Sequence, residues 1–290
     1  MTEWSNGYIG SNYSSTVYYA TWVKNCTFIN SAVVHPSSVV DSGAIIGANV
    51  TIGPFCHIGS EVTLNDDVEL KSHVVVSGWT TIEEKTTIFP FASIGHIHKD
   101  LKFSGERTKL EIGKRNRIRE HVTMNPGTDG GGGLTKIGDD GLFMMGVHIG
   151  HDCIVGNNVI MANNASLGGH CIVENNVVIG ALAGVHQFCR VGRGAMIGGL
   201  SAVVADVIPM GMVIGERANL DGLNLIGLKR AGVDKDHING LRAAFKLIFQ
   251  GDSTVKDAIK PTLDLYEGNP LVEEMISFIT SETSRSLTIS

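Results

Sequence analysis

The chain has 290 residues, of which 43% are hydrophobic, 18% charged and 6% aromatic, and its formal net charge at pH 7 is -6. This apolar content excludes an intrinsically disordered chain, and the lack of a basic excess argues against a nucleic-acid partner. No apolar run reaches the roughly 20 residues that span a bilayer, and the N-terminus has no secretory-signal pattern. We therefore expect no transmembrane segment and a cytoplasmic protein.

Residues 1–27 are polar and rich in tyrosine, so we predict an N-terminal extension or irregular cap. Trp22 and Cys26 have the spacing of one extra rung of the repeat that follows.

A six-residue repeat occupies the middle of the chain. An apolar residue recurs at every sixth position in three runs, Val34 to Ile94, Ile112 to Met124 and Ile137 to Val203. A period of six fits neither a helical face nor a heptad, but it allows a short strand and a turn with one large residue pointing into a narrow core. We therefore predict a mainly β protein, with a parallel β-helix over residues 28–210.

Three hexads make one triangular turn of 18 residues, called a coil below, so residues 18 apart lie above one another at about 4.8 Å. The fourth position after each large apolar residue is usually small and is predicted to point inward. Cys153, Cys171 and Cys189 share this position at a spacing of 18. We predict a buried column of free thiols, since the chain has no CxxC pair. Gly47 and Gly53 represent the glycines that often follow the large residue, which suits a tight corner.

Two insertions interrupt the repeat, at residues 95–111 and 125–135. Loops that leave one side of a solenoid commonly build its binding surface. The second insertion contains a glycine run, but no GK[ST] motif or helix start follows it, so it does not predict a phosphate loop. We expect a mobile flap there.

Residues 211–290 are predicted to form a C-terminal segment and a small helical domain. Helical spacing is shown by Leu241, Phe245, Leu247 and Ile248. Asn269 and Pro270 have the residue types of a helix N-cap and first turn.

Histidines gather at one corner of the predicted coils. The 18-residue spacing stacks His151, Gly169 and Gln187, and the neighbouring histidines are His148, His170 and His186. Apart from His148, which lies just upstream in the same coil, these positions follow the inward residues Ile149, Leu167 and Val185 by one to three residues, so we expect them at an outward-facing corner of the prism.

Two chemistries fit this corner. Asp152 could orient His151 as a general base, and the backbone N–H of Gly169 could stabilise an oxyanion, which together suit acyl transfer. Three imidazoles could instead hold Zn²⁺ with an open coordination position. The spacing alone leaves both hypotheses open.

A set of longer motifs resembles the acyl-[acyl-carrier-protein]–UDP-N-acetylglucosamine O-acyltransferases of lipid A biosynthesis, within the hexapeptide-repeat acyltransferase superfamily. The motifs are HPSSVVDSGAIIGANVTIGPFCHIG, LKSHVVV, KDLKFSGE, NRIRE, HIGHDC, ANNASLGGH, VHQFCRVG and GLNLIGLKRAG. They follow one another over roughly residues 30–290. The resemblance implies a homotrimer of left-handed parallel β-helices with active sites between neighbouring subunits.

By this resemblance, the enzyme moves a 3-hydroxyacyl chain from acyl carrier protein to the glucosamine 3-hydroxyl of UDP-N-acetylglucosamine. His151 is then the general base, Asp152 orients it, and the Gly169 amide stabilises the oxyanion. The resemblance also assigns substrate contacts to Asp100, Lys102, His148, His170, His186, Gln187, Asn224 and Arg230. It places an acyl-chain ruler at Gly199, with Arg217 beside the acyl groove, and implies no metal and no cofactor.

The chain departs from the family pattern at several positions near the substrates, namely Lys99, Asn125, Arg217 and Ile226. The choice between UDP-N-acetylglucosamine and its 3-amino analogue therefore stays open.

The carrier protein is strongly acidic, so a basic docking patch is expected. Candidates are Arg190, Arg193, Lys229, Arg230, Arg242 and Lys246.

Three alternative functions remain at this point. A γ-type carbonic anhydrase would use the histidines to bind zinc, but would leave the KDLK loop without a role. A sugar-nucleotide N-acyltransferase would share the base chemistry and differ in its product. A non-catalytic or ice-binding solenoid would favour regular polar ladders on a flat face over histidines at one corner.

Overall fold

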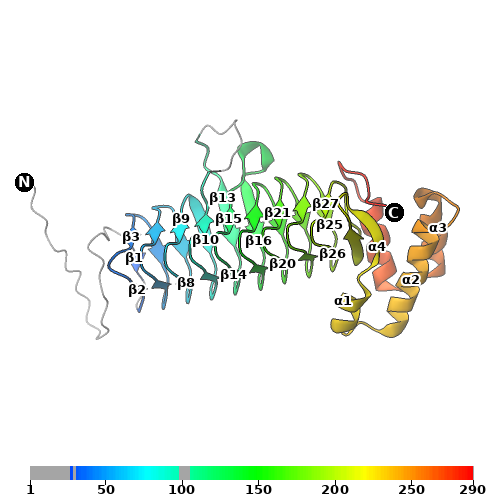
Figure 1. Cartoon of the computed structure of the whole chain (residues 1–290), viewed down its shortest axis with the longest axis horizontal. Helices are drawn as coiled ribbons and strands as arrows, with labels where there is room; N and C mark the ends of the chain where they lie inside the picture. The colour runs from blue at the N-terminus through cyan, green and yellow to red at the C-terminus, as the bar shows by residue number, and fades with distance from the viewer. Residues whose placement is uncertain (1–26, 29–30, 98–104, 290) are drawn as a thin grey trace, which may run out of the picture.

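The computed structural model describes residues 27–28, 31–97 and 105–289. Over these residues the chain forms a long triangular prism of short strands, with helices at its C-terminal end (Figure 1). The predicted parallel β-helix and C-terminal helical part are therefore confirmed. Trp22 and Cys26, with nearly all of the expected N-terminal extension, lie outside the described residues.

Each face of the prism is one sheet, and neighbouring strands within a face are mostly three strands apart in sequence. The β1 sheet comprises β1 (Thr27–Phe28), β4 (Ile45–Ile46), β7 (Thr63–Leu64), β10 (Trp79–Ile82), β13 (Lys109–Ile112), β16 (Leu134–Ile137), β19 (Ile154–Val155), β22 (Ile172–Val173) and β25 (Arg190–Val191). The β2 sheet comprises β2 (Val33–Val34), β5 (Thr51–Ile52), β8 (Glu69–Leu70), β11 (Thr87–Ile88), β14 (Arg117–Ile118), β17 (Leu142–Phe143), β20 (Ile160–Met161), β23 (Val178–Ile179), β26 (Met196–Ile197), β28 (Gly211–Ile214) and β29 (Asn219–Leu223). The β3 sheet comprises β3 (Val39–Val40), β6 (His57–Ile58), β9 (Val75–Val76), β12 (Ser93–Ile94), β15 (Thr123–Met124), β18 (His148–Ile149), β21 (Ser166–Leu167), β24 (Gly184–Val185) and β27 (Ala202–Val203).

The hexads fold this way because each two-residue strand turns its first side chain outward and its second inward. In β4, for example, Ile45 is exposed and Ile46 is fully buried. Every large apolar residue of the three predicted runs is buried in the core. The 18-residue coil is confirmed as well, since His148 pairs with Ser166 and Ser166 pairs with Gly184.

The glycines after the large residues serve a different purpose from the one predicted. Gly47 and Gly53 do not adopt positive φ angles; a Cβ on either would lie within 2.8 Å of backbone atoms of the next coil. The left-handed conformation falls two residues later, at Asn49 and Phe55. Glycine is therefore needed for the close approach of stacked coils, and the corner itself is made by the left-handed residue.

The column of cysteines lies in the core as predicted. Cys153, Cys171 and Cys189 are fully buried and unbridged. A hydrogen bond with Cys153 and burial both raise the pKa of the Cys171 thiol, and burial raises the pKa of Cys189 to about 12. The Cys171 and Cys189 thiols stay protonated at neutral pH, and all three buried cysteines act as small apolar side chains.

The two insertions leave the prism near each other. The backbone N–H of Gly127 donates to Lys109 O at 3.1 Å, and that of Lys109 donates to Gly133 O at 2.8 Å. The second insertion contains a 3₁₀ turn, Asp129–Gly131, that projects from one edge of the prism (Figure 1). The sheet continues across both insertions, because β10 pairs with β13 and β13 with β16.

The β2 sheet extends beyond residue 210, the expected end of the β-helix, because β28 pairs with β26 and β29 pairs with β28. The C-terminal helices follow β29. They are α1 (Leu225–Arg230), α2 (Lys235–Phe249), α3 (Val255–Leu265) and α4 (Pro270–Thr280). Asn269 caps α4 through its side chain, and Pro270 is in the first turn, as predicted. Of the four residues that indicated helical spacing, Leu241, Phe245 and Ile248 are buried, whereas Leu247 is 43% exposed. Among the described residues, no helix combines the length and apolar character that crossing a bilayer requires.

The segment after α4 returns to the last coils of the prism. Asp206 is completely buried, and its carboxylate accepts hydrogen bonds from the Arg190 guanidinium and the Thr283 hydroxyl, both at 2.8 Å. The backbone of Asp206 also pairs with Ser286 and Thr288. One buried carboxylate thus joins the prism to the C-terminal segment.

Replacing Asp206 with Ala should lower the free energy of unfolding by about 3 kcal/mol, because it leaves the guanidinium of Arg190 without its buried partner. Urea-induced unfolding measures this change. The control is Asp264→Ala, which removes an exposed ion pair with Lys260 and should leave stability unchanged. Equal stabilities for the two variants would contradict the prediction.

Candidate active site

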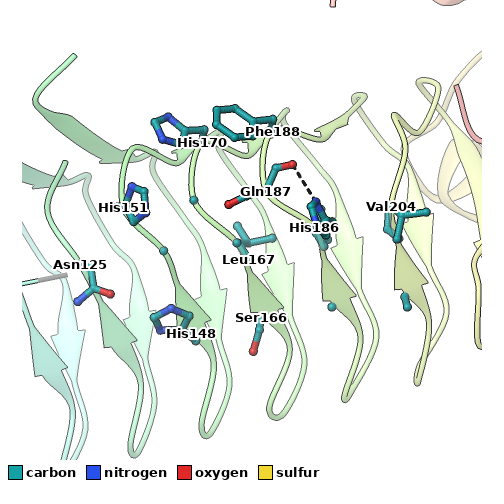
Figure 2. A pocket seen from close by; sticks show the side chains of 17 residues that line it. Asn125, His148, His151, Ser166, Leu167, His170, His186, Gln187, Phe188 and Val204 are labelled. Atoms are coloured by element: carbon teal, nitrogen blue, oxygen red, sulfur yellow. Dashed lines mark hydrogen bonds between the residues drawn. The ribbon is translucent and has the colours of Figure 1, made fainter. Parts of the chain in front are cut away.

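The corner between the β3 sheet and the β1 sheet carries the predicted histidines on its outer side (Figure 2). A cavity of about 790 Å³ lies against this corner. Its lining includes Asn125, His148, His151, Gly169, His170, His186, Gln187 and Phe188. The sequence therefore located the corner correctly.

Gly169 lies directly against the His151 ring, one coil further along. A Cβ added to Gly169 would be 2.6 Å from Cε1 and 2.7 Å from Nε2 of His151. The backbone confirms the stacking, because His170 N–H donates to His151 O at 2.9 Å and Phe188 N–H donates to Gly169 O at 3.0 Å. Any side chain at position 169 would displace the imidazole.

The tautomer of His151 is set by Asp152. Nδ1 of His151 lies 2.7 Å from Oδ2 of Asp152, whose side chain is only 1% exposed. Nδ1 donates to this carboxylate, which leaves Nε2, the ring nitrogen beside Gly169, as the proton acceptor. The predicted pairing of the two residues is present.

Asp152 reaches this position because it is the left-handed corner residue of its coil, with φ of 59°. Its backbone N–H donates to Thr135 Oγ1 at 2.7 Å. The carboxylate accepts hydrogen bonds from Thr128, through the backbone N–H at 2.8 Å and the hydroxyl at 2.7 Å. The glycine-rich insertion, expected to be a mobile flap, is thus anchored at Thr128.

The backbone N–H of Gly169 differs in its hydrogen bonding from the equivalent N–H groups at another corner of the prism. Between the β1 and β2 sheets, the matching N–H of Asp139 donates to Asn157 Oδ1 and that of Asn157 donates to Asn175 Oδ1, both at 2.7 Å. Within the described part of the chain, the Gly169 N–H has no such acceptor. A donor is therefore available beside Nε2 of His151.

His170 and His148 are held by ring contacts and by a hydrogen bond, respectively. His170 meets the His151 ring edge-on at 5.0 Å and stacks on Phe188 at 4.4 Å between ring centroids. His148 Nδ1 lies 2.7 Å from the Thr123 hydroxyl. Figure 2 shows His148 lower on the same face, beside Ser166.

His186 is held by Arg285, which lies in the segment after α4. One guanidinium nitrogen of Arg285 lies 2.9 Å from His186 Nδ1 and 2.9 Å from the carbonyl oxygen of Gln187. Nδ1 of His186 also lies 3.2 Å from the carbonyl oxygen of Gln187 (Figure 2), so Arg285 and Gln187 together hold this side of the imidazole ring.

Four other predicted site residues, Asn224, Arg230, Gly199 and Arg217, are not among the residues that line this cavity. Asn224 caps α1, and its amide accepts from Gly227 N–H and donates to Gly194 O. Arg230 is exposed at the end of α1, and Gly199 is exposed at the corner between the β2 and β3 sheets. Arg217 forms an isolated bridge with Ala202, which lines the cavity. Asp100 and Lys102 lie outside the described residues.

Sequence reasoning missed Thr128 and Arg285. Thr128 belongs to an insertion that interrupts the 18-residue spacing, so the spacing gave no position for it. Arg285 is separated from His186 by 99 residues. The sequence shows only that an arginine follows the last helix. Such an arginine is common in proteins and does not indicate a contact with the histidines.

One group of atoms has the spacing of a metal site, formed by His151, Asp152 and His170. His170 Nε2 lies 3.7 Å from Oδ2 of Asp152, but this oxygen already accepts from Thr128 and His151. The set therefore resembles a hydrogen-bonded relay more closely than an open zinc site with three imidazoles.

Two family models match the chain. The bacterial transferase hexapeptide model, which describes six repeats, matches residues 43–78 and 134–169, and the model of domain 2 of UDP-N-acetylglucosamine O-acyltransferase matches residues 206–288. The hexapeptide model covers parts of the prism, and the domain 2 model covers the C-terminal helices.

Curated relatives and solved structures agree with these matches. The chain is 56% identical over 69% of its length to the acyl-[acyl-carrier-protein]–UDP-N-acetylglucosamine O-acyltransferase of Paracoccus denitrificans, and the match covers 75% of that protein. It is 54% identical over 73% of its length to the enzyme of the same name from Caulobacter vibrioides, covering 81% of it.

The structure of UDP-N-acetylglucosamine acyltransferase from Campylobacter jejuni matches with a TM-score of 0.84 at 37% identity, over 89% of this chain and 99% of that one. The fold is accordingly a left-handed parallel β-helix with a small C-terminal helical part. The chain therefore belongs to the family of acyl-[acyl-carrier-protein]–UDP-N-acetylglucosamine O-acyltransferases.

Proposed function

We propose that this protein transfers a 3-hydroxyacyl chain from acyl carrier protein to the 3-hydroxyl of UDP-N-acetylglucosamine, the first step of lipid A biosynthesis, in the cytoplasm. The observation that carries the proposal is the His151–Asp152 pair beside Gly169 at the cavity, in a chain of this family. The names of the relatives supply the two substrates.

The chemistry follows from the positions of three groups. Nε2 of His151 takes the proton of the sugar hydroxyl as its oxygen attacks the thioester carbonyl of the donor. The new C–O bond gives a tetrahedral oxyanion, which the N–H of Gly169 stabilises. The C–S bond then breaks, and the leaving thiolate takes the proton back from the His151 imidazolium. Asp152 stabilises that imidazolium in the interval.

The cavity residues would hold the reacting parts of both substrates. His148, His170, His186 and Gln187 line it and offer donors and acceptors for the sugar and the acyl 3-hydroxyl. Arg285 holds His186 in the cavity wall through its contact with Nδ1. Asp100 and Lys102 complete the sugar site by the family resemblance.

We further propose a homotrimer in which a second copy completes each site. Asn224 and Arg230 would then serve the nucleotide end of a neighbouring subunit's cavity. Neither residue lines the cavity of its own chain, although both match the family's nucleotide contacts, and this supports the arrangement.

The acidic carrier protein would dock on the exposed basic residues of the helical region, which are Lys229, Arg230, Arg242 and Lys246. Arg190 and Arg193, also predicted to contribute, are engaged inside the chain. Arg190 pairs with buried Asp206 and Arg193 pairs with Glu274. Both guanidinium groups are therefore already engaged in ion pairs within the chain.

His151→Ala should abolish nearly all acyl transfer, by roughly a thousandfold, because it removes the general base. The assay follows acyl transfer from 3-hydroxyacyl carrier protein to UDP-N-acetylglucosamine, and hydroxylamine cleavage identifies the product as an ester rather than an amide. His57→Ala, an outward histidine on the same sheet far from the cavity, should retain activity. Full activity in His151→Ala would reject the mechanism.

Gly169→Ala should lower kcat by about a hundredfold, because its methyl group displaces the His151 ring beside the oxyanion donor. Gly59→Ala is the matched control, since the added Cβ would make only ordinary contacts, the closest at 3.4 Å. Similar kcat values for both variants would contradict the proposed arrangement.

The enzyme should prefer the longer 3-hydroxyacyl donors of the family's range, because Gly199 has no side chain to shorten the acyl groove. Each step of two methylenes contributes about 1.6 kcal/mol, or roughly tenfold to twentyfold in kcat/KM. Turnover across a series of acyl-carrier donors measures the preference. A clear preference for the shortest donor would reject the role of Gly199.

A further inference from the structure

The glycine-rich insertion covers the carboxylate of Asp152. Thr128 donates to both of its oxygens, at 2.8 Å from the backbone N–H and 2.7 Å from the hydroxyl. A Cβ on Gly131 would lie only 2.2 Å from the carboxylate carbon. The Asp152 side chain is 1% exposed, whereas the adjoining His151 side chain is 23% exposed.

The turn that makes these contacts is closed on itself and tied to the prism. The carbonyl of Thr128 accepts hydrogen bonds from Gly131 N–H at 3.0 Å and Gly133 N–H at 2.8 Å. Lys109 connects both ends of the turn, through bonds with Gly127 and Gly133. Thr128 is therefore held in place by backbone bonds that do not involve Asp152.

A fixed carboxylate matters for the base beside it. A carboxylate can rotate about its Cβ–Cγ bond, and each oxygen can accept more than one hydrogen bond. With Thr128 bonded to both oxygens, rotation is prevented and Oδ2 stays directed at Nδ1 of His151. Exclusion of water by Gly131 strengthens this hydrogen bond, since the local dielectric is low.

We propose that Thr128 is a positioning residue for the base, and that Gly131 is required so that the turn can close over Asp152. The relay then runs from Thr128 through Asp152 to His151, with only His151 meeting the substrates. This inference rests on the proposed acyl transfer for its kinetic consequences. Its structural part, the dependence of the His151–Asp152 bond on Thr128, can be measured without turnover.

The first test compares Thr128→Val with Thr128→Ser. Valine keeps the shape and the backbone N–H but loses the hydroxyl donor, and serine restores the donor. We expect kcat to fall about tenfold in Thr128→Val, with KM for both substrates within twofold, and to recover to within about threefold in Thr128→Ser. An equal loss in both variants, or no loss in Thr128→Val, would overturn the proposal.

A double-mutant cycle separates positioning from a general structural effect. If Thr128 acts only through the Asp152 carboxylate, adding Thr128→Val to Asp152→Asn should change kcat by less than about twofold. Independent losses that multiply in the double variant would show that Thr128 acts elsewhere, and would overturn the proposal.

The glycine is tested by two neighbouring substitutions. Gly131→Ala directs a methyl group at the Asp152 carboxylate, while Gly130→Ala directs one into open space, and neither glycine has a positive φ angle. We expect kcat to fall at least tenfold in Gly131→Ala and to stay within twofold of wild type in Gly130→Ala. Equal activities would refute the requirement for glycine at position 131.

Nuclear magnetic resonance of the imidazole protons gives the readout that needs no substrate. The proton shared by His151 Nδ1 and Asp152 should give a downfield signal in the wild type that is weakened or lost in Thr128→Val and kept in Thr128→Ser. A signal unchanged in Thr128→Val would overturn the proposal. Wild-type protein that shows the expected Thr128-dependent signal but no acyl transfer would instead refute the proposed function alone.

Discussion

The stacking of coils at a fixed repeat is the constraint on which the rest of the structure depends. Each coil contributes one large and one small inward side chain per face, and the core has room for no more. Sheet hydrogen bonds then hold each residue above its counterpart one coil away, as His148 lies above Thr123 and below Ser166. Outward side chains are therefore positioned by the core, although they take no part in it.

This constraint lets equivalent corner positions carry different chemistry. At one corner, Asn157 and Asn175 use their side chains to bond the amides of the preceding coils, and the result is a structural ladder. At the histidine corner, Gly169 takes the equivalent place and has no side chain to bond the amide of His151. The backbone is the same at both corners, so the change from scaffold to reactive site needs few substitutions.

The sequence predicted the fold and the central pair because both depend on spacing. The hexads identified the buried residues, and the 18-residue interval brought His151 to Gly169. The spacing could not predict contacts made by segments outside the repeat, which is why Thr128 and Arg285 were missed. The spacing also predicted that Gly47 forms a tight corner. Glycine is needed there because the backbone of the next coil lies too close for a Cβ, and this contact is visible only in the folded stack. Arg190 and Arg193 looked like surface charges because their acidic partners, Asp206 and Glu274, lie outside the hexapeptide repeat, so the spacing gave no position for them.

Because the C-terminal segment returns to the prism, the cavity wall depends on residues that lie far along the chain. Asp206 pairs with residues 286 and 288, and Arg285 bonds to His186 in the cavity wall. The repeats that form the cavity end at Val203, but His186 acquires its supporting guanidinium only from Arg285, which lies 99 residues further along the chain than His186. A fragment that ends before Arg285 would contain the hexapeptide coils and still lack this contact in the cavity wall.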